Sequence, residues 1–148
     1  MKLFKVQLLE KDYPKAIEIW ENAVIATHSF LKEKDRIELK HEIPKYFSHV
    51  EAYLWFYEEQ AIGFSGTNEQ HLEMLFIDPK YFNQGFGTEI LRYLIKQNKI
   101  QYVDVNKDNK KATQFYIKNG FEIFKTSRFD SQGRDYPILH LKLGGQSL

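Results

Sequence analysis

The sequence predicts a single α/β domain of the α+β kind, in which strands outnumber helices. The chain has 148 residues, 43% of them hydrophobic, which is enough for one substantial core but not for two. About seven segments have the alternation or composition of strands, and about four have helical spacing. Strands and helices follow one another as β-α-β-α-β in the second half. We therefore expect residues 1–148 to form one domain.

The chain is expected to open with a strand followed by a helix. Residues 3–8 (LFKVQL) alternate like a half-buried strand. The next segment, 13–28, begins beside Pro14 and places Ile17, Trp20 and Val24 at helical spacing. A helix that carries one apolar stripe packs that stripe against a core.

A charged helix and a three-stranded meander are expected next. Residues 32–42 have helical character, and Pro44 is expected to interrupt this helix because proline donates no backbone hydrogen bond. From Val50 the segments become rich in aromatic residues, as strands are. A short polar turn, Glu58-Glu59-Gln60, joins the first two of the expected strands, which span 50–58, 61–66 and 70–78.

The second half alternates helices with strands. A two-glycine bend leads directly into a helix whose apolar stripe is Ile90, Leu91, Leu94 and Ile95. A strand is expected at 101–106, and a helix from about Asn109 to Lys118, closed by Gly120 just after its C-cap. The chain then forms a hairpin of 121–130 and 135–143 across SQGR.

Composition and charge exclude several classes of function. Lys and Arg number 21 and Asp and Glu 20, so the basic excess of a nucleic-acid binder is missing and we expect no nucleic-acid partner. Cysteine is absent, which excludes disulfides, thiolate metal sites and a cysteine nucleophile. The charged start lacks the apolar segment of a signal peptide, and no run approaches the ~20 apolar residues of a membrane span. We expect a cytoplasmic protein with no membrane partner.

The bend DPKYFNQGFGTEI (78–90) has the composition of an anion site. A Walker A loop needs Gly-Lys, which is missing, and a dinucleotide fingerprint needs a third glycine where Ile90 stands. What remains is a glycine bend at the start of a helix, where free N–H groups and the helix dipole favour negative charge. A glycine turn that only fits a helix against a sheet is the structural alternative.

A second motif follows the strand at 101–106. It reads Asn109-x-x-Ala112-x-x-Phe115-Tyr116-x-x-x-Gly120-Phe121, with Asn106 at the strand end. Together with residues 75–91 it resembles the GNAT superfamily of acetyl-CoA-dependent N-acetyltransferases. The resemblance covers essentially the whole chain, and the blocks at 26–31, 75–79 and 130–141 are similar to one small bacterial member.

The resemblance implies the fold and the donor. The GNAT fold is a central mixed, mostly antiparallel, twisted sheet of about seven strands with about four helices, splayed between strands four and five. In this family the glycine loop binds the pyrophosphate of coenzyme A. Acetyl-CoA is therefore the expected acetyl donor, held by Leu75, Phe76, Ile77, Asn83, Gln84, Gly85, Phe86, Gly87, Thr88, Asn106, Asn109 and Tyr116.

One position departs from the family pattern. The loop usually begins with Gln or Arg three residues before the first glycine, and here that residue is Phe82. The departure puts one side-chain contact to the pyrophosphate in question. Backbone contacts do not depend on it.

The catalytic residues are also implied by the resemblance. Tyr116 would protonate the departing sulfur; its alternative is a packed helix aromatic. An acceptor amine with a pKa near ~10.4 needs a base at neutral pH. The candidates are Glu73 and His71 on the strand beside the donor, His28 near the acceptor cleft, and a water molecule. No histidine spacing indicates a metal site.

Two functions follow as hypotheses. The first is an N-acetyltransferase, monomeric or homodimeric, whose acceptor is the primary amine of a small molecule, peptide or protein that attacks directly in a ternary complex. The second is a non-catalytic acyl-CoA-binding sensor. Tyr116 favours the enzyme and Phe82 the sensor. Aromatic residues that could line the acceptor cleft are Trp55, Phe56, Tyr57, Phe82, Phe129 and Tyr136.

Overall fold

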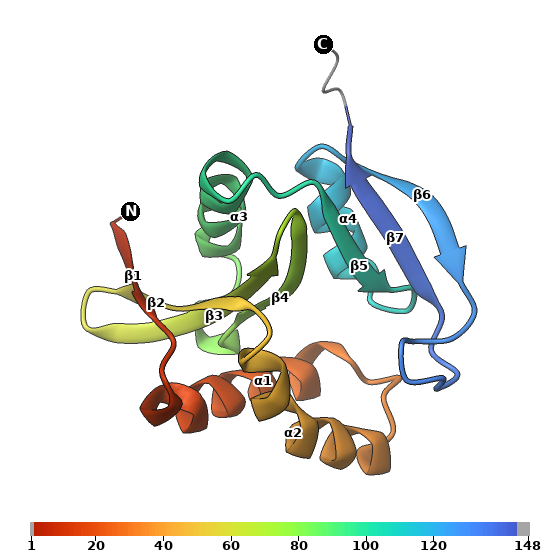
Figure 1. The fold of residues 1–148 in the computed structure, drawn as a ribbon, viewed down its shortest axis with the longest axis horizontal. Helices are drawn as coiled ribbons and strands as arrows, with labels where there is room; N and C mark the ends of the chain where they lie inside the picture. The colour runs from red at the N-terminus through yellow and green to blue at the C-terminus, as the bar shows by residue number, and fades with distance from the viewer. Residues whose placement is uncertain (1, 145–148) are drawn as a thin grey trace.

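The computed structural model describes residues 2–144 and shows a seven-stranded sheet flanked by four α-helices (Figure 1). The strands are β1 (Leu3–Gln7), β2 (Glu51–Tyr57), β3 (Gln60–Asn68), β4 (His71–Ile77), β5 (Tyr102–Asn106), β6 (Phe121–Ser127) and β7 (Ile138–Leu143). The helices are α1 (Tyr13–Thr27), α2 (Glu33–Phe47), α3 (Phe86–Gln97) and α4 (Lys110–Lys118), with short 3-10 turns η1 (Glu10–Asp12) and η2 (Pro79–Tyr81).

The sheet consists of two antiparallel parts joined by one short parallel contact. Its strand order is β1-β2-β3-β4-β5-β7-β6. The parallel strands β4 and β5 pair only at His71 with Tyr102 and at Leu72 with Val103, and they diverge beyond these pairs (Figure 1). The predicted mixed sheet and the splay between the fourth and fifth strands are therefore confirmed.

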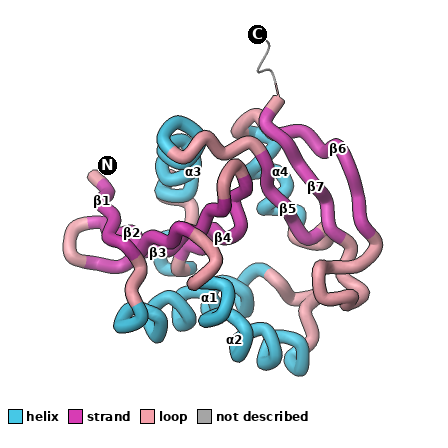
Figure 2. Tube along the Cα trace, in the orientation of Figure 1, coloured by secondary structure: helices cyan, strands magenta, loops and turns pink. Residues whose placement is uncertain are grey.

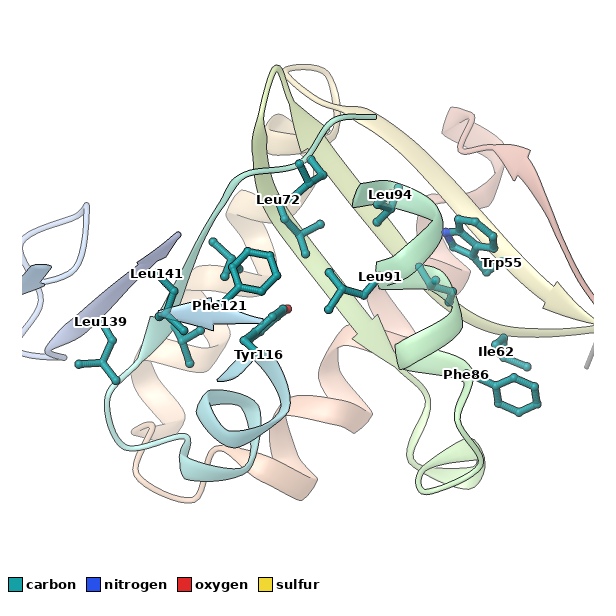
Figure 3. Packing of buried hydrophobic residues seen from close by; sticks show 14 residues of the cluster. Trp55, Ile62, Leu72, Phe86, Leu91, Leu94, Tyr116, Phe121, Leu139 and Leu141 are labelled. Carbon is teal, nitrogen blue, oxygen red and sulfur yellow. The ribbon is translucent and has the colours of Figure 1, made fainter. Parts of the chain in front are cut away.

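Two apolar clusters hold the helices on opposite faces of the sheet. Helices α1 and α2 pack on one face of the β1–β4 part, around Trp20, Phe47 and Phe64. Helices α3 and α4 pack on the other face, and their cluster extends over both parts of the sheet (Figures 1 and 3). The second cluster therefore connects the two parts across the splay.

Helix α1 has the predicted amphipathic pattern. Pro14 stands in its first turn, where the missing N–H costs no helical hydrogen bond. The residues that α1 buries recur every three or four positions, as one apolar stripe requires; they are Ala16, Ile19, Trp20, Ala23 and Val24. This stripe leads directly into the end of the helix at Thr27 and His28.

The expected end of the second helix was wrong. Helix α2 runs through Pro44 to Phe47, although an interior proline costs roughly 3 kcal/mol. Ile43 and Phe47 flank this proline and are each only 4% exposed. Burial stabilises by ~1.5–3 kcal/mol for each such side chain, so packing of the last turn offsets the proline.

The final hairpin has a longer connection than expected. Strand β6 ends at Ser127 and β7 begins at Ile138, because the side chain of Asp130 folds the intervening chain into a turn. Its Oδ1 accepts the backbone N–H groups of Gln132 at 2.9 Å and Arg134 at 2.7 Å. Such local bonds compete with strand pairing. We call residues 128–137 the β6–β7 loop.

Within residues 2–144, no helix is both long enough and apolar enough to cross a membrane.

Candidate active site

The splay between β4 and β5 opens a cleft in the sheet. Beyond Leu72 and Val103 the two strands share no ladder pairs within the described residues. The register between β3 and β4 also shifts at Gly66/Thr67, which leaves Glu73 as an extra residue with no partner on β3. Such a bulge re-aims the strand. The resulting cavity of about 110 Å³ is lined by His28, residues 72–76 and 103–106, Asn109, Ala112 and Tyr116.

The glycine bend lies at the end of β4 and presents backbone N–H groups. Asn83 and Gly85 have positive φ angles of 63° and 85°, and Gly85 is the N-cap of α3. The first backbone N–H of α3 that donates to a carbonyl of the preceding turn is that of Glu89, which donates to the Gly85 carbonyl at 3.1 Å. The N–H groups of Phe86, Gly87 and Thr88 therefore have no acceptor in their own helix, and this end of α3 suits an anion.

A second cavity lies beside the cleft, between α1, α2 and the β6–β7 loop. It has a volume of about 200 Å³. Its walls are mostly apolar, and the lining residues are Trp20, Val24, His28, Phe30, Leu31, Leu39, Phe76, Asn106, Asp130, Tyr136 and Ile138. His28, Phe76 and Asn106 line both cavities. The two cavities therefore meet at these three side chains.

The β6–β7 loop is bonded to the start of α2, and Asp130 and Tyr136 of this loop line one side of the second cavity. Figure 2 shows the course of the loop between β6 and β7. The hydroxyl of Tyr136 donates to Asp35 and accepts the backbone N–H of Lys32 at 3.2 Å. The Arg134 guanidinium, only 14% exposed, lies 3.0 to 3.9 Å from the carboxylates of Asp35, Glu38, Glu42 and Asp130. The loop is therefore fixed by both a buried hydrogen bond and a group of ion pairs.

His28 stands at the C-cap of α1 and faces the junction of the cavities. Its Nδ1 lies 2.7 Å from the hydroxyl of Thr27, and its Nε2 lies 3.5 Å from the side-chain nitrogen of Asn109. Burial lowers the pKa of the His28 imidazole to about 4, since a charged ring loses hydration there. The ring is neutral at pH 7.

Tyr116 of α4 also lines the cleft. Its ring packs edge-on against Phe115 and Phe121 and lies between α3 and β7 in Figure 3. Burial raises the pKa of the Tyr116 phenol above its ordinary value. The hydroxyl therefore remains protonated at neutral pH and can donate a hydrogen bond into the cleft.

The structure brings most of the expected site residues together. Around the cleft lie His28, Glu73, Leu75, Phe76, Asn106, Asn109 and Tyr116. The other donor-site candidates lie at the end of β4 or in the glycine bend that follows it, namely Ile77, Asn83, Gln84, Gly85, Phe86, Gly87 and Thr88. Asn109 is also the N-cap of α4, because its Oδ1 accepts the Ala112 N–H at 3.2 Å.

Two of the base candidates pair with each other at the open rim. His71 Nδ1 lies 3.4 Å from Glu73 Oε2, and both side chains are about 40% exposed. The His71 ring stacks on Tyr102 at the paired end of the two strands. Glu73 lines the cleft, whereas His71 is not among its lining residues.

Sequence reasoning missed Thr27 and most of the second cavity. Of the aromatic residues considered, all within residues 2–144, Tyr136 alone lines either of these two cavities, whereas Trp55 is buried in the core. The signal for Thr27 was present, because it lies three residues after Val24 on the apolar stripe of α1. The Thr27 hydroxyl at the end of this stripe contacts the His28 ring, which lines both cavities.

Comparison with known proteins identifies the family. The family model described as an acetyltransferase (GNAT) domain matches residues 50–123, which include the glycine bend and the Phe115-Tyr116 pair. The chain belongs to the GNAT family of acetyltransferases. The predicted N-acetyltransferase is thereby confirmed, and the sensor alternative is not favoured.

Individual GNAT relatives agree with this membership. The peptidyl-lysine N-acetyltransferase YjaB of Salmonella typhimurium is 34% identical over 130 residues, which cover 86% of this chain and 88% of YjaB. The solution structure of apo-form YjaB from Escherichia coli superposes with a TM-score of 0.89 at 29% identity, covering 98% and 99% of the two chains. YjaB is also the small bacterial member whose short blocks the sequence resembles.

A more distant GNAT structure shows the same fold. The PaiA N-acetyltransferase of Thermoplasma acidophilum, solved in complex with coenzyme A, has a TM-score of 0.69 at 20% identity, and the match covers 96% of this chain and 99% of PaiA.

The lowered pKa of His28 predicts a pH-dependent stability. Between about pH 6.5 and pH 4 the unfolded chain protonates this ring while the folded chain does not, so stability falls as pH falls through this window. Each pH unit contributes about 1.4 kcal/mol, which gives a loss of roughly 3 kcal/mol. Urea unfolding at pH 7 and pH 4.5 should show that His28→Gln loses less stability than wild type.

His41→Gln, at an exposed position of α2, is the matched control for removal of an imidazole. Between pH 7 and pH 4.5 this variant should lose as much unfolding stability as the wild type does. An equal loss in wild type and in His28→Gln would contradict a neutral, half-buried His28.

Proposed function

We propose that this acetyltransferase transfers the acetyl group of acetyl-CoA to the side-chain amine of lysine in peptides or proteins. The observation that carries the proposal is the junction of the two cavities at His28, Phe76 and Asn106. A donor in the cleft and an acceptor in the second cavity would meet there. Residues 1–148 would act as one domain, because the two apolar clusters and the hydrogen bond between Tyr136 and Asp35 connect segments from both halves of the chain.

The residues present suit coenzyme A. Phosphate groups fit the free N–H groups at the start of α3, where Gly85 adopts the left-handed conformation that glycine tolerates best. The cleft between β4 and β5 is lined by Leu75 and Phe76, near the end of the strand that precedes this loop, and by Tyr116. Asn106 and Asn109 on its wall offer amides to the pantetheine arm. Acetyl-CoA, when bound, supplies an acetyl group activated as a thioester.

The chain's own groups would assist both ends of the transfer. Backbone N–H groups of β4 that face the splay have no ladder partner on β5, and they can donate to the carbonyl oxygen as negative charge develops there. Tyr116, protonated and lining the cleft, can donate its proton to the leaving sulfur. No cysteine is present, so no acetyl-cysteine intermediate can form, and the amine would attack the thioester directly.

The second cavity suits a lysine side chain. Its walls include Trp20, Val24 and Leu39, which can contact the four methylene groups of lysine. An apolar environment also disfavours the ammonium form and so favours the neutral amine that reacts. The YjaB enzymes named above, described as peptidyl-lysine acetyltransferases, support this choice of acceptor.

A panel of amines tests the acceptor. The blocked peptide acetyl-Gly-Gly-Lys-Gly-Gly-amide should react with a kcat/KM at least about tenfold above that of spermidine or free lysine, because those two amines bring additional charged groups to a mostly apolar cavity, where unpaired charge is disfavoured. Release of the CoA thiol is the measurement. The same peptide with norleucine in place of lysine is the control and should give no turnover. Turnover only with polyamines or α-amines would contradict the proposal.

A matched pair at Gly85 tests the donor site. Asn and Asp both tolerate the left-handed conformation and both serve as N-caps, so Gly85→Asn and Gly85→Asp should fold alike. Only the aspartate places a negative charge against the pyrophosphate. We expect Gly85→Asp to bind CoA about 5- to 30-fold more weakly than Gly85→Asn, or ~1–2 kcal/mol. Calorimetry measures both, and equal affinities would place the pyrophosphate elsewhere.

Removal of one oxygen tests Tyr116. Tyr116→Phe keeps the ring that packs on Phe115 and Phe121 but removes the proton donor. General-acid contributions are typically ~10²–10⁴-fold, so kcat should fall in that range while acetyl-CoA affinity and melting temperature stay near wild type. A kcat within threefold of wild type would exclude Tyr116 as the acid. A lowered melting temperature would instead indicate a packing role.

A further inference from the structure

We propose that His28 is the general base for the acceptor amine, and that Thr27 and Asn109 are positioning residues that hold its imidazole with Nε2 unprotonated. This inference rests on the proposed function, because it assigns the group that receives the proton of the acceptor. It also selects one among the base candidates considered above. Polar contacts around the His28 ring determine its tautomer.

The Thr27 hydroxyl fixes the proton on Nδ1. A hydroxyl has one proton to donate, and that of Thr27 is donated to the carbonyl of Ala23 at 2.8 Å. The contact of 2.7 Å between the same oxygen and Nδ1 of His28 must then be donated by the ring. Nδ1 therefore carries the proton. In a neutral imidazole, Nε2 is then an acceptor with a free lone pair.

Asn109 supports the same tautomer from the other side of the ring. Its Oδ1 is occupied as the helix cap, accepting the Ala112 N–H at 3.2 Å. The capping bond orients the amide so that Nδ2, which is only a donor, faces His28 Nε2 at 3.5 Å. A donor in this position is compatible with an unprotonated Nε2 and not with Nε2–H. The contact is long, so a closer amine could replace it.

The position of His28 suits proton transfer better than that of the other histidines. Its ring lines both cavities, at the place where an amine in one would meet an acetyl group in the other. His140 Nε2 is already bonded to Ser127 at 2.7 Å and its Nδ1 to Asp104. His71 is paired with Glu73 at the exposed rim. Among these rings, His28 has the Nε2 that faces the junction.

The proton balance of the reaction is complete with these groups. The neutral amine forms the C–N bond, and its nitrogen becomes acidic as its lone pair is shared, so one N–H proton passes to His28 Nε2. The C–S bond breaks and the thiolate takes the proton of Tyr116. His28 then releases its proton to solvent, and the Tyr116 phenolate recovers one. The net change is amine plus thioester to amide plus thiol.

The test combines nitrogen-15 NMR of the histidine rings with kinetics on the full chain. At pH 7 the wild-type spectrum should show His28 as the Nδ1–H tautomer. Thr27→Val, which keeps the shape but removes the hydroxyl, should give a mixture of tautomers and lower kcat/KM about tenfold or more. Thr27→Ser restores the hydroxyl and should recover both the tautomer and the rate to within about threefold of wild type.

Variants of the two competing bases complete the experiment. With the panel amine that reacts fastest, His28→Gln should lower kcat by ~10²–10⁴-fold with unchanged CoA affinity, and this loss should be at least about tenfold larger than the loss caused by Glu73→Gln. A larger loss of kcat in Glu73→Gln than in His28→Gln would overturn the inference, and so would an Nε2–H tautomer of His28 in the wild-type chain. If the lysine peptide fails to react while another amine does react, the proposed acceptor is overturned. The inference about His28 is not overturned by that result, because its tautomer and the rates of the variants are measured without the peptide. Absence of turnover with every amine would overturn both.

Discussion

The separation of β4 from β5 is the constraint on which the rest of this structure depends. A parallel pair that stops after two residue pairs leaves backbone groups without ladder partners, and such groups are costly when buried. The bulge at Glu73 directs β4 away from β5. The unpaired edge is useful only if a ligand can bond to it, and the cavity along this edge provides the room. The defect in the sheet and the candidate donor site are therefore the same feature.

A split sheet needs other contacts to hold its two parts together. On one face, Leu91 and Leu94 of α3 belong to the same buried cluster as Leu141 of β7 and Phe121 of β6 (Figure 3). On the other face, the Tyr136–Asp35 bond joins the β6–β7 loop to α2. These contacts leave the cleft itself unfilled. The second cavity lies beside the second contact, so the loop that joins the two parts also forms one wall of this cavity.

Local patterns predicted the elements, and long-range contacts decided the details of the site. The stripe of α1, the glycine bend and the cap at Asn109 are readable because each depends on neighbours within four residues. The extent of α2 beyond Pro44 was not readable, since it depends on burial of Ile43 and Phe47 against the sheet. Likewise, His28 and Asn109 are 81 positions apart, and only the folded chain brings them into contact.

The proposed chemistry follows from the low polarity of the place where the cavities meet. Burial there disfavours a charged imidazole, as the lowered pKa of His28 shows, and by the same physics it disfavours an ammonium group beside it. Two neutral groups then face each other, and the amine keeps the lone pair with which it attacks. A neutral imidazole at this position has a lone pair that can accept the proton of the attacking nitrogen, which becomes acidic as the new C–N bond forms.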